Sequence, residues 1–78
     1  MGQSDLPDAS GTQHEKVFQK LGWVTRRQGT HIVMTHANQF GVTLSIPNHR
    51  KVKRTTLHGL VKAAGLTDSF YRQVFDSV

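Results

Sequence analysis

Positions that share one helix face recur at helical spacing in two segments of the chain. In the first segment, four of them stand at i, i+3, i+4 and i+7: His14, Val17, Phe18 and Leu21. In the second segment, four apolar residues have the same spacing: Leu57, Leu60, Val61 and Ala64. This period gathers each set on one face of an α-helix. The pattern therefore predicts two amphipathic helices with polar outer faces.

The ends of these helices carry residues that commonly start and stop a helix. Ser10 and Gln13 have the spacing of a capping box at the start of the first helix. Thr55 or Thr56 is expected to cap the second helix. Glycines stand where the two helices are expected to end, at Gly22 and Gly65. Leu66, after the second glycine, completes the pattern of a Schellman turn.

Between the two helices, three short segments have the composition and alternation of β-strands: Trp23–Arg27, His31–His36 and Val42–Ile46. They are joined by a turn at Gln28–Thr30 and a loop at Ala37–Gly41. Connections this short favour antiparallel neighbours and predict a three-stranded meander. Thr67–Phe75 has the pattern of a last short helix, with Phe70, Val74 and Tyr71 as the candidates for its inward face.

The element order predicts an α+β fold in the sequence α-β-β-β-α, followed by a short C-terminal helix. Two helices would cover one face of a three-stranded antiparallel sheet and leave the other face open, as in double-stranded-RNA-binding (dsRBD-like) domains. Residues 10–78 are expected to form a single domain, and the polar residues 1–9 a flexible N-terminal arm. Three aromatic residues are expected in the core: Phe18, Trp23 and Phe40.

Charge is unevenly distributed along this 78-residue chain, which has 10 Lys and Arg against 5 Asp and Glu and a net charge of +5. All five acidic residues lie outside the segment 16–67, whereas nine of the ten basic residues lie inside it. A solvated basic face is the ordinary explanation of a short charge run. An acid-free stretch of this length instead favours a surface that contacts RNA or DNA.

Several classes of function are disfavoured by the composition. The chain has no cysteine, which excludes disulfides and thiolate metal sites. It is too short for a cofactor domain, and no apolar run approaches the length of a membrane span. No secretory signal pattern is present at the N-terminus. We therefore expect a cytoplasmic protein with no cofactor, no bound metal and no membrane partner.

The candidate site begins at a turn. Gly29 and Thr30 precede His31 at the start of the second expected strand. Gly29 can adopt a positive φ and leaves the backbone uncovered, so a phosphate could approach closely. Basic residues that could bind further phosphates stand in two groups, one on the first strand and one running into the second helix: Arg26, Arg27, Arg50, Lys51, Lys53 and Arg54.

A series of short motifs follows in order along most of the chain. The motifs are Leu6-Pro7, Ser10-Gly11, Leu21-Gly22-Trp23, Arg27-Gln28-Gly29-Thr30-His31, His36, Ile46-Pro47-Asn48-His49, Lys53-Arg54-Thr55-Thr56-Leu57 and Lys62-Ala63-Ala64-Gly65-Leu66. With these motifs the chain resembles the HicA family of toxins from toxin–antitoxin pairs, and the resemblance extends from Leu6 to about Thr67. The chain departs from the family in having Thr30 where Ser is usual, a different loop at Ala37–Gly41, and His58 where Arg is more common.

The resemblance implies the toxin of a type II pair: an endoribonuclease that cuts mRNA, stops translation and is held inactive by a HicB-type antitoxin. The essential histidine of the family carries over to His31. Imidazole suits this chemistry because its reference pKa lies near neutrality, so it can take a proton from a 2′-OH. Among the other histidines, His14 and His58 are expected at the surface or boundary of helices. His36 and His49 are expected to finish turns or to touch RNA.

Two other functions fit the same pattern. A non-catalytic RNA-binding module of similar fold would use the basic residues alone, but it would have no need of a histidine at the Gly-Thr turn. A DNA-binding protein ranks last, because no helix presents Asn, Gln and Arg together in its first turn.

Overall fold

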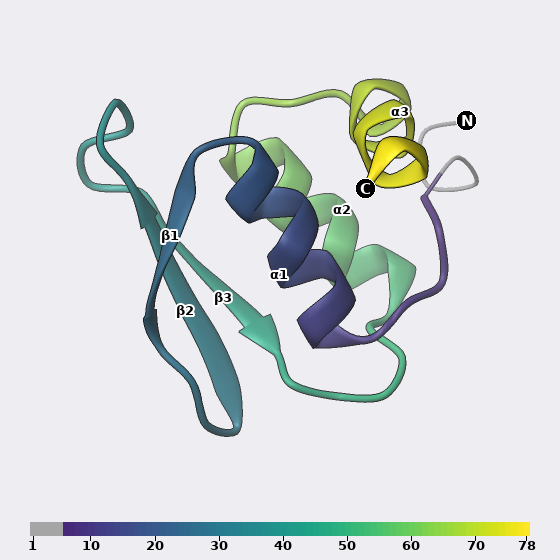
Figure 1. The fold of residues 1–78 in the computed structure, drawn as a ribbon, viewed down its shortest axis with the longest axis horizontal. Helices are drawn as coiled ribbons and strands as arrows, with labels where there is room; N and C mark the ends of the chain where they lie inside the picture. Colours follow the sequence, from purple (N-terminus) through teal and green to yellow (C-terminus); the bar gives the residue numbers. More distant parts are fainter. Residues whose placement is uncertain (1–5) are drawn as a thin grey trace.

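The computed structural model describes residues 6–78 and confirms the α+β fold. The elements in chain order are α1 (Gly11–Lys20), β1 (Trp23–Arg27), β2 (His31–His36), β3 (Thr43–Pro47), α2 (Arg54–Ala63) and α3 (Asp68–Ser77). The first five reproduce the expected α-β-β-β-α order, and α3 is the expected C-terminal helix (Figure 1).

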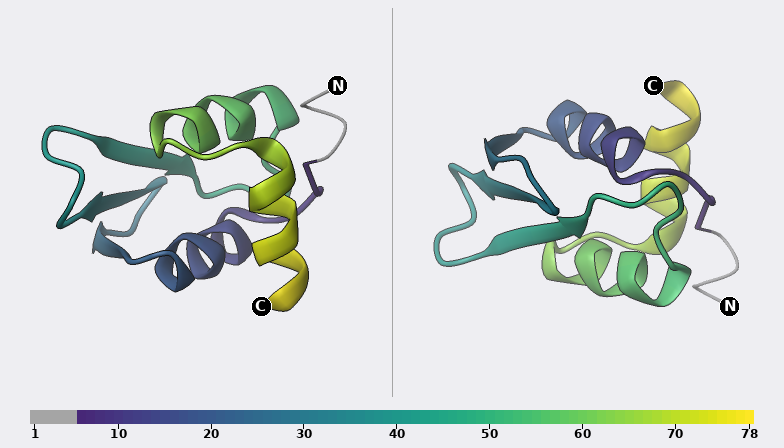
Figure 2. Two further views of the ribbon diagram at one scale, coloured as in Figure 1. Left: turned by 90° about the horizontal axis from the view of Figure 1, so that it is seen from above. Right: turned by 90° about the horizontal axis from the view of Figure 1, so that it is seen from below.

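The sheet is an antiparallel meander in the order β1-β2-β3. Alternation along β2 and β3 turns four side chains to one face, where all are fully buried: Ile32, Met34, Leu44 and Ile46. Helices α1 and α2 both pack on this face, α1 mainly over β1 and α2 over β3, and the opposite face carries no helix (Figure 2). The sheet therefore has one buried face and one open face, as the strand pattern predicts.

The helix ends agree with the sequence except at the start of α2. The Ser10 hydroxyl accepts a bond from the Gln13 backbone, and the Gln13 side chain closes the capping box. At the end of α2, the backbone N–H of Leu66 donates to Val61 O, and Gly65 has φ of 79°, which is the Schellman geometry. Neither Thr55 nor Thr56 caps α2: the N-cap is Lys53, whose side chain makes no capping bond.

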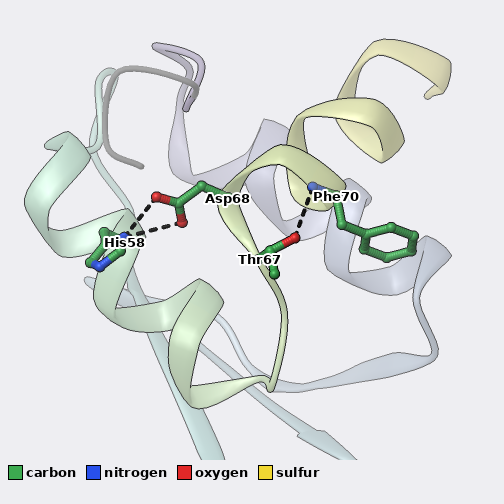
Figure 3. A network of polar contacts seen from close by, with 4 residues as sticks. All are labelled: His58, Thr67, Asp68 and Phe70. Atoms are coloured by element: carbon green, nitrogen blue, oxygen red, sulfur yellow. Dashed lines mark hydrogen bonds and ion pairs between the residues drawn. The ribbon is translucent and has the colours of Figure 1, made fainter. Parts of the chain in front are cut away.

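Helix α3 packs across α1 and α2 at the end of the molecule away from the sheet (Figures 1 and 2). Tyr71 is fully buried there. Asp68 accepts a bond from His58 Nδ1 at 2.8 Å, joining α3 to α2, and the Thr67 hydroxyl caps the helix at Phe70 N (Figure 3). The expectation that Phe70 faces inwards is wrong, because Asp68 and Tyr71 occupy the buried face and leave Phe70 44% exposed.

Three further expectations need correction. Phe40 is fully exposed rather than in the core, because the turn between β2 and β3 projects beyond the body of the domain (Figure 1). His14 is fully buried rather than at a helix surface, because α3 covers that side of α1. Leu6 and Ala9 are buried, so residues 6–9 pack on the domain and do not form a free arm. Residues 1–5 of the expected arm lie outside the described residues.

Candidate active site

His31 is the first residue of β2 and is exposed to solvent. Its neighbour Ile32 is fully buried under the helices. Because side chains alternate along a strand, His31 lies on the open face, as Val33 and Thr35 also do. Its partner across the sheet is Pro47, the last residue of β3. The histidine therefore stands at one end of an accessible sheet face.

A β-bulge in β1 brings two arginines to that face. Thr25 pairs with Met34, but the next pair along the strand joins Arg27 to Val33, so Arg26 is an extra residue in β1. Residues at a bulge share one partner and lose the ordinary alternation. The side chain of Arg26 donates from Nε to Thr35 Oγ1 at 2.9 Å, which fixes it on the open face. Simple alternation would have sent one of the two arginines to each face.

The turn before His31 is held from two sides. On the β3 side, Asn48 Nδ2 donates to Gly29 O at 2.9 Å, and the Asn48 backbone N–H donates to Thr30 O at 3.0 Å. On the α1 side, Gln28 Nε2 donates to the carboxylate of Glu15 at 2.9 Å. These bonds restrict the backbone that leads into His31. Sequence reasoning missed these bonds, because the side-chain partner of Asn48, Gly29, is 19 residues away in the chain.

Glu15 is an acidic residue buried beside this turn, with 6% of its surface exposed. Its carboxylate accepts hydrogen bonds from Gln28, from the Thr25 hydroxyl and from Gln19. These donors are all neutral. A buried carboxylate requires several such bonds to replace its hydration, so Glu15 ties α1, β1 and the turn together.

Two features were expected at Gly29, an uncovered backbone and a positive φ, and the structure has only the first. A Cβ built on it would meet nothing within 4 Å, so the backbone there is uncovered and open to a ligand. Its φ is not positive; the positive-φ glycines of the described chain are Gly22, Gly41 and Gly65. Thr30 is exposed, and its hydroxyl lies 3.5 Å from His31 Nδ1, too long for a strong hydrogen bond.

The basic loop, residues 50–54, is anchored to the residues that lead into α1. Val52 is buried, its backbone N–H donates to Ala9 O at 2.9 Å, and His49 O accepts from Gly11 N at 2.9 Å. Arg50, Lys51, Lys53 and Arg54 are all exposed. Lys51 and Arg54 form ion pairs with Asp8. Segment 16–67 contains no acidic residue, but the fold brings one from outside the segment into contact with it. Helix α2 has no acidic residue in its first turn.

The remaining histidines have different surroundings. His36 Nδ1 accepts from Asn38 N at 3.0 Å, and its Nε2 lies 3.1 Å from Leu21 O. Because Nδ1 accepts, Nε2 is the ring atom that donates to Leu21 O. The carbonyl of His36 accepts from Gln39 N at 3.0 Å, so His36 begins the turn after β2 and does not finish one. His58 pairs with Asp68, while His14 bonds Tyr71 in the core. His49 is exposed at the same end of the sheet as His31.

The candidate site is a surface and not a cavity. A hollow of about 360 Å³ lies between α1 and α3, lined by Gln13, Lys16, Val17, Phe75 and Val78, and it includes none of the candidate residues. Within residues 6–78, no three His, Asp or Glu side chains are grouped closely enough to hold a metal ion. No helix in the same range is long and apolar enough to cross a membrane.

In a comparison with known families, residues 11–66 match the family described as the HicA toxin of bacterial toxin–antitoxin. The chain belongs to this family of toxins. The matched residues include the turn with His31, both arginines of the bulge and the basic loop, whereas α3 lies beyond them. A comparison with curated proteins gives no match.

Proposed function

We propose that this HicA-family toxin is an endoribonuclease that cuts mRNA in the cytoplasm and so inhibits translation, with His31 as its single catalytic side chain. One observation carries the proposal: an exposed histidine shares an open sheet face with two arginines, both of which a bulge in β1 places on that face. A proton-transfer group beside fixed cations is what cleavage of a phosphodiester requires.

The proposed reaction is attack by the 2′-oxygen of RNA on the adjacent phosphorus. His31 takes the proton from the 2′-OH as the new P–O bond forms, and the bond to the 5′-oxygen of the next nucleotide breaks. The imidazolium then returns a proton to that leaving oxygen. The products are a 2′,3′-cyclic phosphate and a free 5′-hydroxyl, and no water or metal ion takes part in the bond-breaking step.

The cations have separate roles in this proposal. Arg26 and Arg27 would stabilise the negative charge that grows on the phosphate oxygens during attack. Arg50, Lys51, Lys53 and Arg54 would hold phosphates further along the strand, which positions the RNA without reading its bases. Gly29 and Thr30 directly precede His31, and the uncovered backbone at Gly29 would allow a phosphate to approach.

The toxin's partner is proposed to be a HicB-type antitoxin that covers the open face. Thr43 and Ser45 are exposed on that face, and Val24 is 50% exposed. Where the antitoxin meets residues 50–54 we expect it to be acidic, because opposite potentials speed association. Covering the face would block RNA from His31.

The products of cleavage test the proposed reaction. Purified toxin is incubated with 5′-labelled RNA in excess chelator, and the ends of the fragments are analysed. The proposal predicts cleavage at an undiminished rate, with cyclic or terminal 3′-phosphates and 5′-hydroxyls. Fragments with 5′-phosphates, or activity that chelator removes, would show water attack assisted by a metal ion. RNA that is bound but never cut would favour the non-catalytic RNA-binding module.

A further inference from the structure

The carboxylate of Asp8 lies on two cations of the basic loop. Arg54 Nη2 donates to Asp8 Oδ2 at 3.1 Å, and Lys51 Nζ lies 3.6 Å from the same oxygen. Asp8 is 46 residues away from Arg54 in the chain, so the contact depends on the folded N-terminal segment. The two cations also flank the start of α2, where the first backbone N–H groups have no side-chain cap.

The residues on both sides of Asp8 hold it in this place. Leu6 is 1% exposed and belongs to the hydrophobic core, and Ala9 is 6% exposed. The carbonyl of Ala9 accepts a bond from Val52, inside the basic loop itself. The backbone is thus fixed against the loop, while the Asp8 side chain remains 41% exposed. A ligand can therefore displace the carboxylate without unfolding the segment.

The other acidic residues of the described chain are engaged elsewhere. Glu15 bonds Gln28, Asp68 bonds His58, and Asp76 bonds Arg72 within α3. Within residues 6–78, only Asp8 forms an ion pair with the basic loop. A carboxylate and a phosphodiester each carry one negative charge on oxygens that accept from the same donors.

We propose that Lys51 and Arg54 form a binding site for a phosphodiester of RNA, and that Asp8 occupies this site until RNA displaces it. The inference rests on the proposed function and adds a competitor built into the chain. Ion pairs between exposed groups are weak, so Asp8 lowers RNA affinity without preventing binding. It also screens the loop from other anions when no RNA is bound.

Two substitutions that remove the same charge separate this effect from net charge. Asp8→Asn removes the competing carboxylate, and Asp76→Asn removes a carboxylate from α3. The probe is a single-stranded oligoribonucleotide with 2′-O-methyl groups, which cannot be cut by 2′-oxygen attack. Its dissociation constant is measured for the unmodified toxin and both variants over a series of salt concentrations.

We expect Asp8→Asn to tighten binding about 2- to 10-fold at low salt, the effect of losing one or two weak ion pairs. The dependence on salt should become steeper by up to about 0.7, the contribution of one more phosphate contact on a single strand. Asp76→Asn should change affinity less than about 2-fold. With Lys51→Gln and Arg54→Gln in place, Asp8→Asn should have no further effect.

Other outcomes overturn the inference in distinguishable ways. Equal gains in both variants would mean that only net charge matters. Weaker binding by Asp8→Asn would mean that the carboxylate organises the loop for RNA instead of competing with it. Either result leaves the proposed function standing. If the unmodified toxin does not bind the oligonucleotide even at low salt, the proposed function fails as well.

Discussion

The side-chain amide of Asn48 donates a hydrogen bond to the backbone carbonyl of Gly29 at 2.9 Å. This contact ties the end of β3 to the turn from which His31 emerges. It acts on the proposed catalytic histidine through the backbone and makes no contact with the ring. Asn48 is therefore a positioning residue, and its removal should affect the chemical step more than RNA binding.

We expect Asn48→Ala to lower kcat for RNA cleavage by about 10-fold or more, because small misplacements of a catalytic group are costly. Binding of the 2′-O-methyl oligonucleotide should change little. Asn38→Ala is the matched control, since Asn38 is exposed in the turn between β2 and β3 and uses its backbone N–H for its bond to His36. Equal cleavage by the two variants would remove the positioning role.

The buried pair of His14 and Tyr71 makes stability depend on pH. His14 Nδ1 lies 2.7 Å from Tyr71 Oη, and its Nε2 is buried without a hydrogen-bond partner. Burial lowers the pKa of His14 from 6.5 to about 4, so the native ring stays neutral where the unfolded chain binds a proton. Burial also raises the pKa of Tyr71, which keeps the phenol neutral.

The free energy of unfolding should therefore fall as pH falls from about 6.5 and level off near pH 4. The loss due to His14 is on the order of 3 kcal/mol, because its pKa falls from 6.5 to about 4 on folding and a tenfold change in proton affinity corresponds to about 1.4 kcal/mol. The free energy of unfolding is measured with urea at a series of pH values, for the unmodified toxin and for His14→Gln. It should depend less on pH in the variant than in the unmodified toxin. Identical slopes would contradict this account.

Two glycines give opposite predictions for the same substitution. A Cβ on Gly11 would lie 2.4 Å from Pro47 O, whereas a Cβ on Gly59 would meet nothing within 4 Å. Gly11→Ala should lower the free energy of unfolding by about 1–3 kcal/mol, because backbone must move. Gly59→Ala, on the exposed side of α2, should raise it by about 0.5–1 kcal/mol. Thermal unfolding of both variants measures the difference, and equal shifts in Tm would refute the close approach.

Local pattern predicted the elements of this fold because each depends on neighbours in sequence. For example, the spacing of the apolar residues is sufficient to predict helix α2, and Gly65 is sufficient to predict where the helix ends. At His14 the local pattern gave the wrong environment. His14 is buried because α3 docks on α1, and a contact between distant segments cannot be inferred from neighbouring residues. The prediction that Phe40 is buried was wrong for the opposite reason. The turn that carries Phe40 projects from the domain, so the side chain contacts no core.

The sequence singles out candidate site residues, but it does not give their arrangement in space. His31, the arginines and the basic loop could be identified because each is distinctive in sequence. The bulge that places Arg26 and Arg27 on the same face is a shift in the pairing of β1 with β2. The sequence of β1 alone does not predict such a shift. The contacts of Asp8 and Asn48 could not be predicted, because their partners lie far away in the chain.

The rate of RNA cleavage by His31→Ala tests the central claim most directly. The variant should cut a labelled RNA at least about 100-fold more slowly than the unmodified toxin, the usual contribution of general acid–base catalysis. Its circular dichroism spectrum and its affinity for the 2′-O-methyl oligonucleotide should be preserved. His49→Ala, which removes the other exposed histidine at that end of the sheet, should retain most of the activity. Full activity in His31→Ala, or equal loss in both variants, would contradict the assignment of a single catalytic histidine.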